Sequence, residues 1–357
     1  MKVLEVNLER GWRGGERQTL WTAEALLRLG VSITVMARRG EALAAAARAS
    51  GLPVIEVAGG GAAWRWLLQH GARFDIVHAQ TAHALTACVF SAWGHRRRVV
   101  ATRRVAFALR SRASRFKYAR ADALVAISDA AAAPLEALGL GPVRRIPSAV
   151  QAEPVVAAEV AALRQRWVPE GKRVLATVAA LSPEKDPLTL VEAVRHLAAQ
   201  RQDFVFLHLG SGRLQVETQR AIETAGLSGI YHLVGFQAAV APWYALFDGF
   251  VMSSRSEGLG SSALDAMLRD VPVAATRAGG LAEVVADGRG LGVAVGDSLA
   301  LAKAMAVLID SDAHVAAARA QRIARARAWV QHECSVGTMA QRYLRVFESL
   351  LNQGSPT

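Results

Sequence analysis

The stretch GFVMSSRSEGLGSSALDAMLRDVPVAAT, residues 249–276, holds the pattern that decides the fold. It begins with an apolar run, passes through a glycine turn, enters the helical segment ALDAMLRD and ends in a second apolar run. Short continuous apolar runs predict strands that are buried on both faces. A strand, a helix and another strand in this order predict two parallel strands joined by a right-handed crossover.

The same alternation extends through the whole chain of 357 residues. The apolar runs of the first half are KVLEV, SITVMA, PVIEV, FDIVHA, RVVAT, ALVAIS and RRIPS, and those of the second half are RVLATVA, FVFLHLG, IYHLVG, GFVMSS, VPVAAT and GLGVAV. These are too many strands for one compact sheet. We therefore predict an α/β protein with two Rossmann-like, doubly wound domains.

An Ala-, Pro- and Glu-rich segment at residues 148–173 interrupts the alternation and predicts the domain boundary. We expect an N-terminal domain at 1–155, a C-terminal domain at 156–332 and a last helix at 333–357 that can cross back to the first domain. Two such domains facing each other would place the carboxyl ends of both sheets along one cleft, and open α/β sheets bind ligands at such ends.

The chain begins without a long apolar segment and has no run of about 20 apolar residues, so we expect a cytoplasmic protein with no membrane span. Cys88 and Cys334 lie far apart and follow no metal-binding spacing. The net charge is +12, and residues 95–121 contain ten Arg or Lys and no acidic residue. This window predicts either a solvated basic face or a site for an anionic substrate or an anionic membrane surface. No nucleic-acid-binding motif accompanies it.

The segment SEGLGSSALDAM, residues 256–267, places carboxylates on both sides of a glycine turn at a helix N-terminus. Ser262 and Asp265 fit a capping box. Free backbone N–H groups at such an end attract phosphate, and Gly258 and Gly260 allow a ligand to come close to the backbone. Glu257 would repel phosphate but can accept hydrogen bonds from sugar hydroxyls. The combination suits a sugar nucleotide.

This segment resembles the donor-site signature of retaining GT-B glycosyltransferases of family 4. Other segments resemble the family in the same order, namely GWRGGERQTLWTAEALLRLG, FDIVHAQ, ADALVAISDAAAAPL, RRIPSAV, VAALSPEKDPLTLVEAV, FLHLGSGRLQVETQRAIETAGL, YHLVGF and TRAGGLAEVVADGRGLGV. The resemblance covers nearly the whole chain. The sequence SEGLG is similar to the corresponding sequence of members that build lipopolysaccharide or cell-surface glycans.

The resemblance implies a role for individual residues. Lys185 would contact the donor diphosphate and Glu257 the transferred sugar, and these two are the expected catalytic residues. Asp265 would hold the ribose, and the base would lie near Phe236. The expected donor-binding residues are Gly14, Gly15, Arg255, Gly258, Leu259, Gly260, Ser261, Asp265, Phe236 and Gly210. The expected acceptor-binding residues are His78, His83, Arg103 and Arg104.

The sequence departs from the family pattern at three positions. Asp265 stands where many members have Glu, and it reaches less far by one methylene group. Ala180 replaces an Arg that helps to bind the diphosphate, for which Arg255, or less favourably Arg213, is the expected substitute. Gln80 replaces the second histidine of an H-x-H motif. His78 could be a satisfied histidine at a strand end, and the sequence does not separate it from His83 as the residue that faces the ligand.

The expected reaction needs no cofactor and no metal ion, because the sequence has neither a strand-end D-x-D nor a cluster with metal-ligand spacing. Lys185, an Arg and helix N-termini would instead stabilise the charge of the leaving diphosphate. The resemblance implies that the anomeric configuration is retained. No positioned nucleophile is evident, so same-face attack by the acceptor hydroxyl is expected.

The expected acceptor is an anionic or lipid-linked glycan, such as a lipopolysaccharide core, bound by the N-terminal half. The basic window at 95–121 is predicted to be helical at FALRSRASRFKYA and to lie against anionic lipid or against phosphates of the acceptor. Two other functions remain open, a sugar-nucleotide epimerase or hydrolase and a non-catalytic sugar-nucleotide-binding protein. A dehydrogenase is disfavoured, because no G-x-G-x-x-G follows the first strand.

Overall fold

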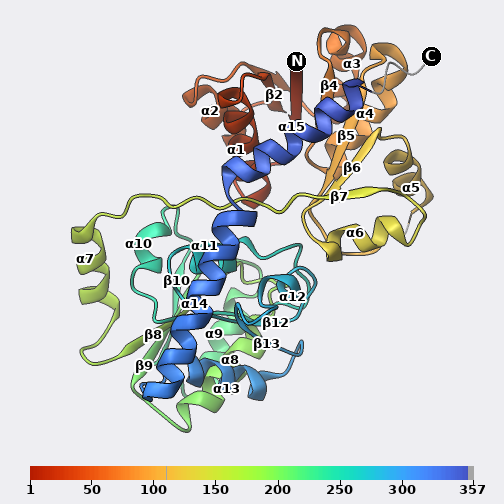
Figure 1. Cartoon of the computed structure of the whole chain (residues 1–357). Helices are drawn as coiled ribbons and strands as arrows, with labels where there is room; N and C mark the ends of the chain where they lie inside the picture. The colour runs from red at the N-terminus through yellow and green to blue at the C-terminus, as the bar shows by residue number, and fades with distance from the viewer. Residues whose placement is uncertain (110, 353–357) are drawn as a thin grey trace. The chain divides into compact units, whose positions relative to one another are not determined.

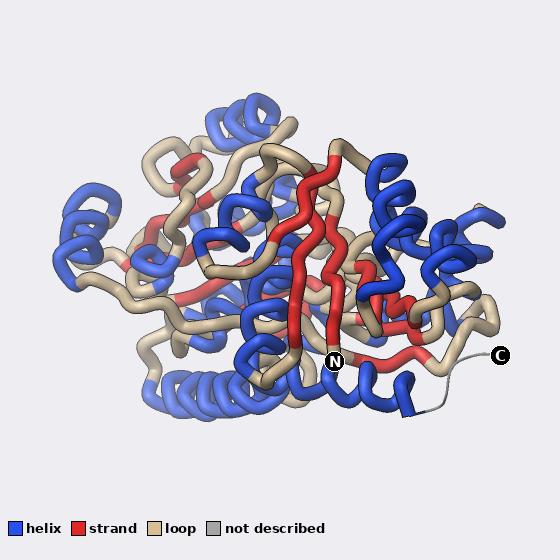
Figure 2. The backbone as a smooth tube through the Cα atoms, turned by 90° about the horizontal axis from the view of Figure 1, so that it is seen from above, coloured by secondary structure: helices blue, strands red, loops and turns tan. Residues whose placement is uncertain are grey.

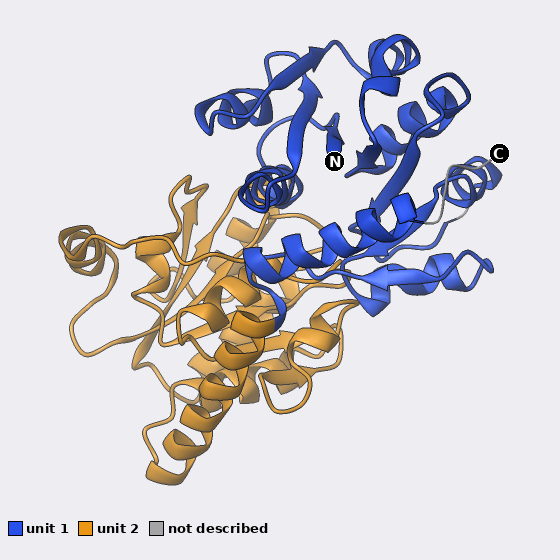
Figure 3. Cartoon of the chain, turned by 45° about the horizontal axis from the view of Figure 1, so that its top comes forward, with its two compact units in different colours: residues 1–149, 333–357 blue, residues 150–332 orange. Residues whose placement is uncertain are grey.

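The computed structural model describes residues 1–109 and 111–352, and it divides into two compact units. The first unit comprises residues 1–149 and 333–357, and the second comprises residues 150–332 (Figures 1 and 3). The division therefore follows Ala149, whereas the sequence placed the boundary after residue 155. Helices flank the strands in each unit, and this layering can be followed in Figure 2.

The first unit is built on a seven-stranded sheet with the order β3-β2-β1-β4-β5-β6-β7. All neighbouring strands are parallel, with Val3 of β1 opposite Ile33 on one side and Ile76 on the other. The strand order reverses between β1 and β4, which is the doubly wound arrangement. The strands are β1 (Lys2–Asn7), β2 (Ser32–Arg38), β3 (Val54–Val57), β4 (Ile76–Ala79), β5 (Arg98–Arg103), β6 (Ala123–Ala126) and β7 (Val143–Arg145).

The last helix of the chain packs in the first unit against α1. Its apolar stripe of Met339, Tyr343, Val346, Phe347 and Leu350 is buried, as is typical of an amphipathic helix. The helices of this unit are α1 (Gly14–Arg28), α2 (Ala42–Ala49), α3 (Gly60–His70), α4 (Ala82–His95), α5 (Arg112–Ala119), α6 (Asp129–Glu136) and α15 (Val336–Asn352), with the 3-10 turn η1 (Gly71–Arg73) after α3.

The second unit repeats the doubly wound order with six parallel strands, β10-β9-β8-β11-β12-β13. They are β8 (Arg173–Val178), β9 (Phe204–Leu209), β10 (Tyr231–Gly235), β11 (Gly249–Met252), β12 (Val273–Thr276) and β13 (Leu291–Val293). The helices are α7 (Ala157–Trp167), α8 (Pro187–Ala198), α9 (Gln215–Thr224), α10 (Ala241–Tyr244), α11 (Ser261–Leu268), α12 (Leu281–Val284), α13 (Ser298–Leu308) and α14 (Ala313–Glu333). The predicted pair of doubly wound α/β domains is confirmed.

His208 in β9 has a neutral ring held inside the second unit. Its Nδ1 lies 2.8 Å from the Tyr231 hydroxyl and its Nε2 lies 3.1 Å from the Ala179 carbonyl oxygen. Burial lowers the pKa of His208 from 6.5 to about 4. Between these values the unfolded chain binds a proton that the folded chain does not, so the stability that the neutral ring provides is complete above pH 6.5 and is lost as the pH falls toward 4.

Lowering the pH from 7 to 4 should therefore reduce the free energy of unfolding of the second unit by up to about 3 kcal/mol, because the unfolded chain gains a proton at His208. Urea unfolding at several pH values measures this, and His208→Gln should flatten the pH dependence. His314→Gln, at an exposed position, is the matched control and should leave the pH dependence as it is. An unchanged slope in His208→Gln would contradict the assignment.

Candidate functional site

The two expected catalytic side chains lie together at the carboxyl edge of the second sheet. Lys185 follows β8 and Glu257 follows β11, and these two strands are hydrogen-bonded neighbours. The Lys185 ammonium forms an ion pair with the Glu257 carboxylate. The two side chains are 24% and 15% exposed, so the pair is partly buried and still open to solvent.

Backbone hydrogen bonds hold the two loops to each other. The Arg255 N–H donates to the Glu184 carbonyl oxygen at 2.8 Å, and the Ser256 N–H approaches the same oxygen at 3.3 Å. The Ser253 hydroxyl lies 2.9 Å from the Lys185 carbonyl oxygen and 2.8 Å from that of Asp186. These bonds hold the backbones of Lys185 and Glu257 opposite each other, independently of the contacts that the two side chains make.

The glycine turn after Glu257 is shaped by close backbone contacts. Gly260 has a φ of +94°, in the region that favours glycine, and it directly precedes α11. Gly280 donates its N–H to the Glu257 carbonyl oxygen at 3.0 Å, and a Cβ at this position would lie 2.2 Å from the Gly258 carbonyl oxygen. Gly258 and Ser261 are half-buried here, whereas the Leu259 side chain is buried. Leu259 therefore offers a ligand its backbone only.

Asp265 is buried within α11 and does not form the predicted capping box. Gly260 is the N-cap residue of the helix and no side chain caps it, so the prediction of Ser262 with Asp265 was wrong. The Asp265 carboxylate instead lies 3.5 Å from the Arg269 guanidinium one turn later. Arg269 also lies over the Tyr244 ring, 5.3 Å from its centroid.

The position of the missing family arginine, Ala180, is exposed just after β8. Its expected substitute, Arg255, forms an ion pair at 2.7 Å with Asp186, and this hydrogen bond raises the pKa of Arg255. A backbone hydrogen bond at Glu184 lowers the pKa of the Glu184 carboxyl, a hydrogen bond from Ser182 lowers it further, and the charges of Arg213 and Lys185 add to this. Arg255 and Arg213 thus both lie close to the loop after β8, which carries Lys185.

Two further donor-binding predictions fall on the neighbouring strands β9 and β10. Gly210 follows β9, and a Cβ on it would lie 2.0 Å from the Ala179 carbonyl oxygen after β8. Phe236 follows β10 with its side chain 67% exposed. Phe236 is therefore not part of the hydrophobic core. The expected donor residues of this unit come from four adjacent strand ends of one sheet.

In the first unit, Gly14 and Gly15 form the start of α1. Arg13 precedes them as the N-cap residue, and its backbone N–H donates to the Glu16 carboxylate at 2.8 Å. No atom would lie within 4 Å of a Cβ added at Gly15, so the space beside it is open. This is compatible with the expected approach of a ligand to the backbone.

The structure separates the four expected acceptor residues into two kinds. His78 is fully buried between Glu5 at 3.0 Å and Thr102 at 2.8 Å, and Arg103 is buried and donates to the Ala131 carbonyl oxygen at 3.1 Å. Neither side chain is free to contact an acceptor, because the fold itself uses their polar atoms. We correct both predictions to structural roles.

His83 and Arg104 remain available. The exposed His83 ring pairs with Glu9 at 2.8 Å, which resolves the alternative between His78 and His83 in favour of His83 as the surface residue. Arg104 is half-buried, and its guanidinium lies 2.5 Å from the Gln80 side-chain oxygen and 3.4 Å from the Ser148 hydroxyl.

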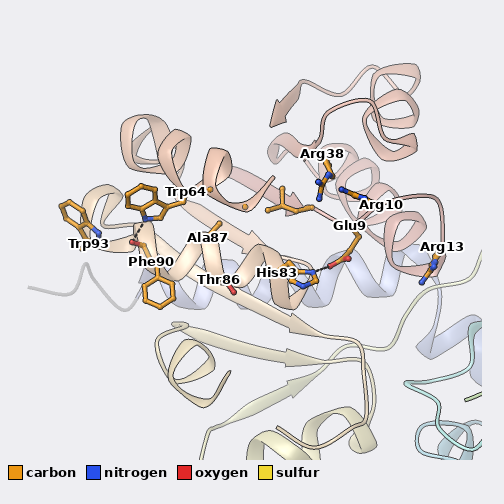
Figure 4. Close-up of a pocket in the computed structure, with 13 residues that line it drawn as sticks. Glu9, Arg10, Arg13, Arg38, Trp64, His83, Thr86, Ala87, Phe90 and Trp93 are labelled. Carbon is orange, nitrogen blue, oxygen red and sulfur yellow. Dashed lines mark hydrogen bonds and ion pairs between the residues drawn. The ribbon is translucent and has the colours of Figure 1, made fainter. Parts of the chain in front are cut away.

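A cavity of about 1030 Å³ lies beside His83 in the first unit (Figure 4). The sequence analysis missed most of its lining, because these residues come from separate helices and loops and form no local motif. The one available signal was an excess of aromatic residues in α3 and α4. The lining residues that were missed include Arg10, Arg13, Arg38, Trp64, Phe90 and Trp93.

The basic window at 95–121 forms helix α5 over Arg112–Ala119 only, with Arg110 outside the described residues. Phe107 and Phe116 are exposed in this window. The exposed basic side chains are Arg96, Arg97, Arg112, Arg115 and Arg120. In the parts of the chain that the structure describes, no helix combines the length and apolarity required to cross a bilayer. Over the same residues, no three His, Cys, Asp or Glu side chains gather as candidate metal ligands.

The two doubly wound units, with paired loops at the carboxyl edge of the second sheet, have the arrangement of the GT-B fold, which is found in glycosyltransferases. Residues 12–153 match the family described as Glycosyltransferase Family 4, and residues 172–311 match the one described as Glycosyl transferases group 1. Together the two matches span most of the chain. The predicted resemblance to family 4 glycosyltransferases is confirmed.

Individual relatives match over shorter stretches. The 2-deoxystreptamine glucosyltransferase of Streptomyces kanamyceticus is 32% identical over 215 residues, which is 58% of this chain and 54% of that protein. The lipopolysaccharide core biosynthesis mannosyltransferase LpsB of Rhizobium meliloti is 33% identical over 138 residues, 38% of each chain. The matches thus span about half or less of these curated relatives.

Solved structures match over nearly the whole chain. The Anabaena protein HepE, crystallised with UDP and glucose, has a TM-score of 0.85 and 20% identity over 98% of this chain and 100% of its own. A glycosyltransferase from Rickettsia africae has a TM-score of 0.86 and 18% identity over 99% of each chain. At these identities the likeness establishes the fold.

Gly280→Ala tests whether the glycine turn depends on the close contact with Gly258. We expect it to lower stability by about 1–3 kcal/mol, because the new methyl group must displace the backbone that carries Glu257. Thermal unfolding measures the loss. Gly229→Ala is the matched control in the same unit, since nothing lies within 4 Å of its Cβ position. Equal melting temperatures in the two variants would refute this dependence.

Proposed function

We propose that the protein transfers a hexose from a nucleoside-diphosphate sugar to a hydroxyl of an anionic or lipid-linked glycan. The anomeric configuration is retained, and neither a metal ion nor another cofactor takes part. The observation that carries this proposal is the partly buried pair of Lys185 and Glu257 at the carboxyl edge of the second sheet. A lipopolysaccharide core is a fitting acceptor, because the Rhizobium meliloti relative is described as acting in its biosynthesis.

Donor binding exchanges the partners of this ion pair. The diphosphate takes the place of Glu257 beside the Lys185 ammonium, and the freed Glu257 carboxylate accepts hydrogen bonds from sugar hydroxyls. Arg255 and Arg213 lie close to the loop that carries Lys185, and they add positive charge where the family arginine is missing. Asp265 receives the ribose, and the exposed Phe236 ring lies beside the base.

The reaction then needs charge stabilisation at the leaving group. The bond between the anomeric carbon and the diphosphate oxygen breaks, and its electron pair goes to the diphosphate, which Lys185 stabilises. The acceptor hydroxyl attacks the same face of the sugar and forms the new bond. Its proton passes to the departing phosphate oxygen. No enzyme carboxylate becomes covalently attached to the sugar.

Lys185→Met and Glu257→Gln should each lower kcat by about 100- to 1,000-fold, because each removes a charge that acts on the reacting groups. A thermal-shift panel of UDP, GDP, ADP and TDP sugars first identifies the donor, and sugar transfer to a lipopolysaccharide-core acceptor is then measured. Arg195→Ala, which removes an exposed ion pair with Glu192 elsewhere on α8, is the control.

Two experimental results would favour one of the alternative functions over sugar transfer. Release of free or epimerised sugar from the donor in the absence of any acceptor would indicate a hydrolase or epimerase. Donor binding with no turnover in any assay would leave a sugar-nucleotide-binding protein. No thermal shift with any of the nucleotide sugars would contradict all three functions.

The exposed arginines around α5 support a further part of the proposal, that the protein acts on the cytoplasmic face of a membrane. Exposed arginines gain free energy near anionic lipid, and Phe107 and Phe116 can enter the interface. We expect vesicles with anionic lipid to retain the protein at low salt, and neutral vesicles to retain it much less.

Replacing Arg112 and Arg115 by Ala should weaken this retention about 30-fold, because each arginine contributes about 1 kcal/mol. Replacing the exposed Arg164 and Arg166 of α7 in the second unit is the matched control. Sedimentation with the vesicles measures both. Equal retention by neutral and anionic vesicles would remove the membrane from the proposal.

A further inference from the structure

The cavity of the first unit has two chemically different ends (Figure 4). Trp64, Phe90 and Trp93 gather at one end, on α3 and α4. Arg10, Arg13 and Arg38 lie at the other end, beside the start of α1 and the end of β2. His83, Thr86 and Ala87 of α4 lie between them. The volume of about 1030 Å³ is at the upper end of the ~300–1,000 Å³ typical of small-molecule sites.

The aromatic end presents apolar surface to solvent. Trp64, Phe90 and Trp93 are 37%, 49% and 73% exposed. The Trp64 indole N–H already donates to the Phe90 carbonyl oxygen at 3.0 Å, so its polar atom is satisfied and its ring offers apolar contact. Phe90 in turn stacks on Phe116 of α5, with ring centroids 6.0 Å apart. This surface gains free energy when an apolar group covers it.

The opposite end offers positive charge. None of Arg10, Arg13 and Arg38 forms an ion pair with a residue that the structure describes. The one carboxylate of the lining, Glu9, is paired with His83 at 2.8 Å. Three guanidinium groups around one end of a cavity are suited to a phosphate or another compact anion.

We propose that this cavity binds an amphiphile along its length, with a phosphate at the arginine end and a hydrocarbon chain against Trp64, Phe90 and Trp93. The inference rests on the proposed function, because the amphiphile is then the acceptor and its head group lies beside Gly14 and Gly15. This inference narrows the class of acceptor. The proposed function allows any anionic or lipid-linked glycan, whereas this cavity requires a glycan whose lipid chain contacts the enzyme.

Ligands that differ in the length of their alkyl chain test the apolar end of the cavity directly. Hexyl phosphate, decyl phosphate and decyl maltoside are titrated into the full chain below their critical micelle concentrations, with calorimetry as the readout. The affinity for decyl phosphate should exceed the affinity for hexyl phosphate by about ten-fold or more, because four more methylene groups leave water. Decyl maltoside, with the same chain and no charge, should bind more weakly than decyl phosphate.

Substitutions locate the two ends. Trp93→Ala and Phe90→Ala should weaken decyl phosphate binding about five-fold or more and leave hexyl phosphate nearly unchanged. Arg38→Ala should weaken both phosphates and leave decyl maltoside nearly unchanged. Leu27→Ala, at an exposed apolar position of the same unit that does not line the cavity, is the matched control and should change none of the three affinities.

Equal affinities for hexyl and decyl phosphate would overturn the proposal. If anionic vesicles nevertheless retained the protein, the aromatic side chains would belong to a membrane-docking surface instead. Unaltered decyl phosphate binding in Trp93→Ala and Phe90→Ala would overturn it as well. The thermal shift with nucleotide sugars is measured in the same variants and is expected to persist, so failure of the proposed function is recognised separately.

Discussion

The site of the second unit depends on the hydrogen bonds that join the loop after β8 to the loop after β11. The Arg255 and Ser256 N–H groups converge on the Glu184 carbonyl oxygen, and the Ser253 hydroxyl bonds to the carbonyl oxygens of the two residues that follow Glu184. Because these bonds involve backbone atoms and one small hydroxyl, they leave the charged side chains free to change partners. The strand order supplies the rest, since β8 and β11 are neighbours at the point where the sheet reverses.

This arrangement also fits the proposal that Arg255 substitutes for the family arginine that Ala180 replaces. The Arg255 side chain is 63% exposed while its partner Asp186 is 4% exposed, so the guanidinium can reorient at small cost whereas the carboxylate stays in place as the cap of α8. Asp186 accepts from the Thr189 hydroxyl at 2.7 Å and keeps a hydrogen bond when Arg255 leaves. A mobile cation is thus kept close to where the diphosphate is proposed to bind.

The sequence was sufficient to predict both sheets, because each buried strand is a continuous apolar run that needs no distant partner to be recognised. The family resemblance also assigned Lys185 and Glu257 to one site, on motifs that stand at strand ends. The sequence failed where distant residues decide the environment. His78 resembles a site residue until Glu5 of β1 and Thr102 of β5 enclose it, and Asp265 resembles a cap until Arg269 and the glycine turn fix its place. The aromatic end of the cavity was missed for the same reason.

The two units hold their charges in different ways, and this difference fits the two kinds of ligand proposed for them. In the second unit Lys185 and Arg255 already have carboxylate partners, so the proposed donor would exchange these ionic contacts for its own. The free energy gained from each cation would be only the difference between the new contact and the old one. In the first unit the arginines of the cavity form no ion pair with a described residue, so an anion displaces only water from them. A diphosphate with several hydroxyls can satisfy both halves of a broken ion pair, whereas an amphiphile with one compact charged head cannot. The paired charges therefore suit the sugar nucleotide, and the unpaired arginines beside an apolar wall suit the acceptor.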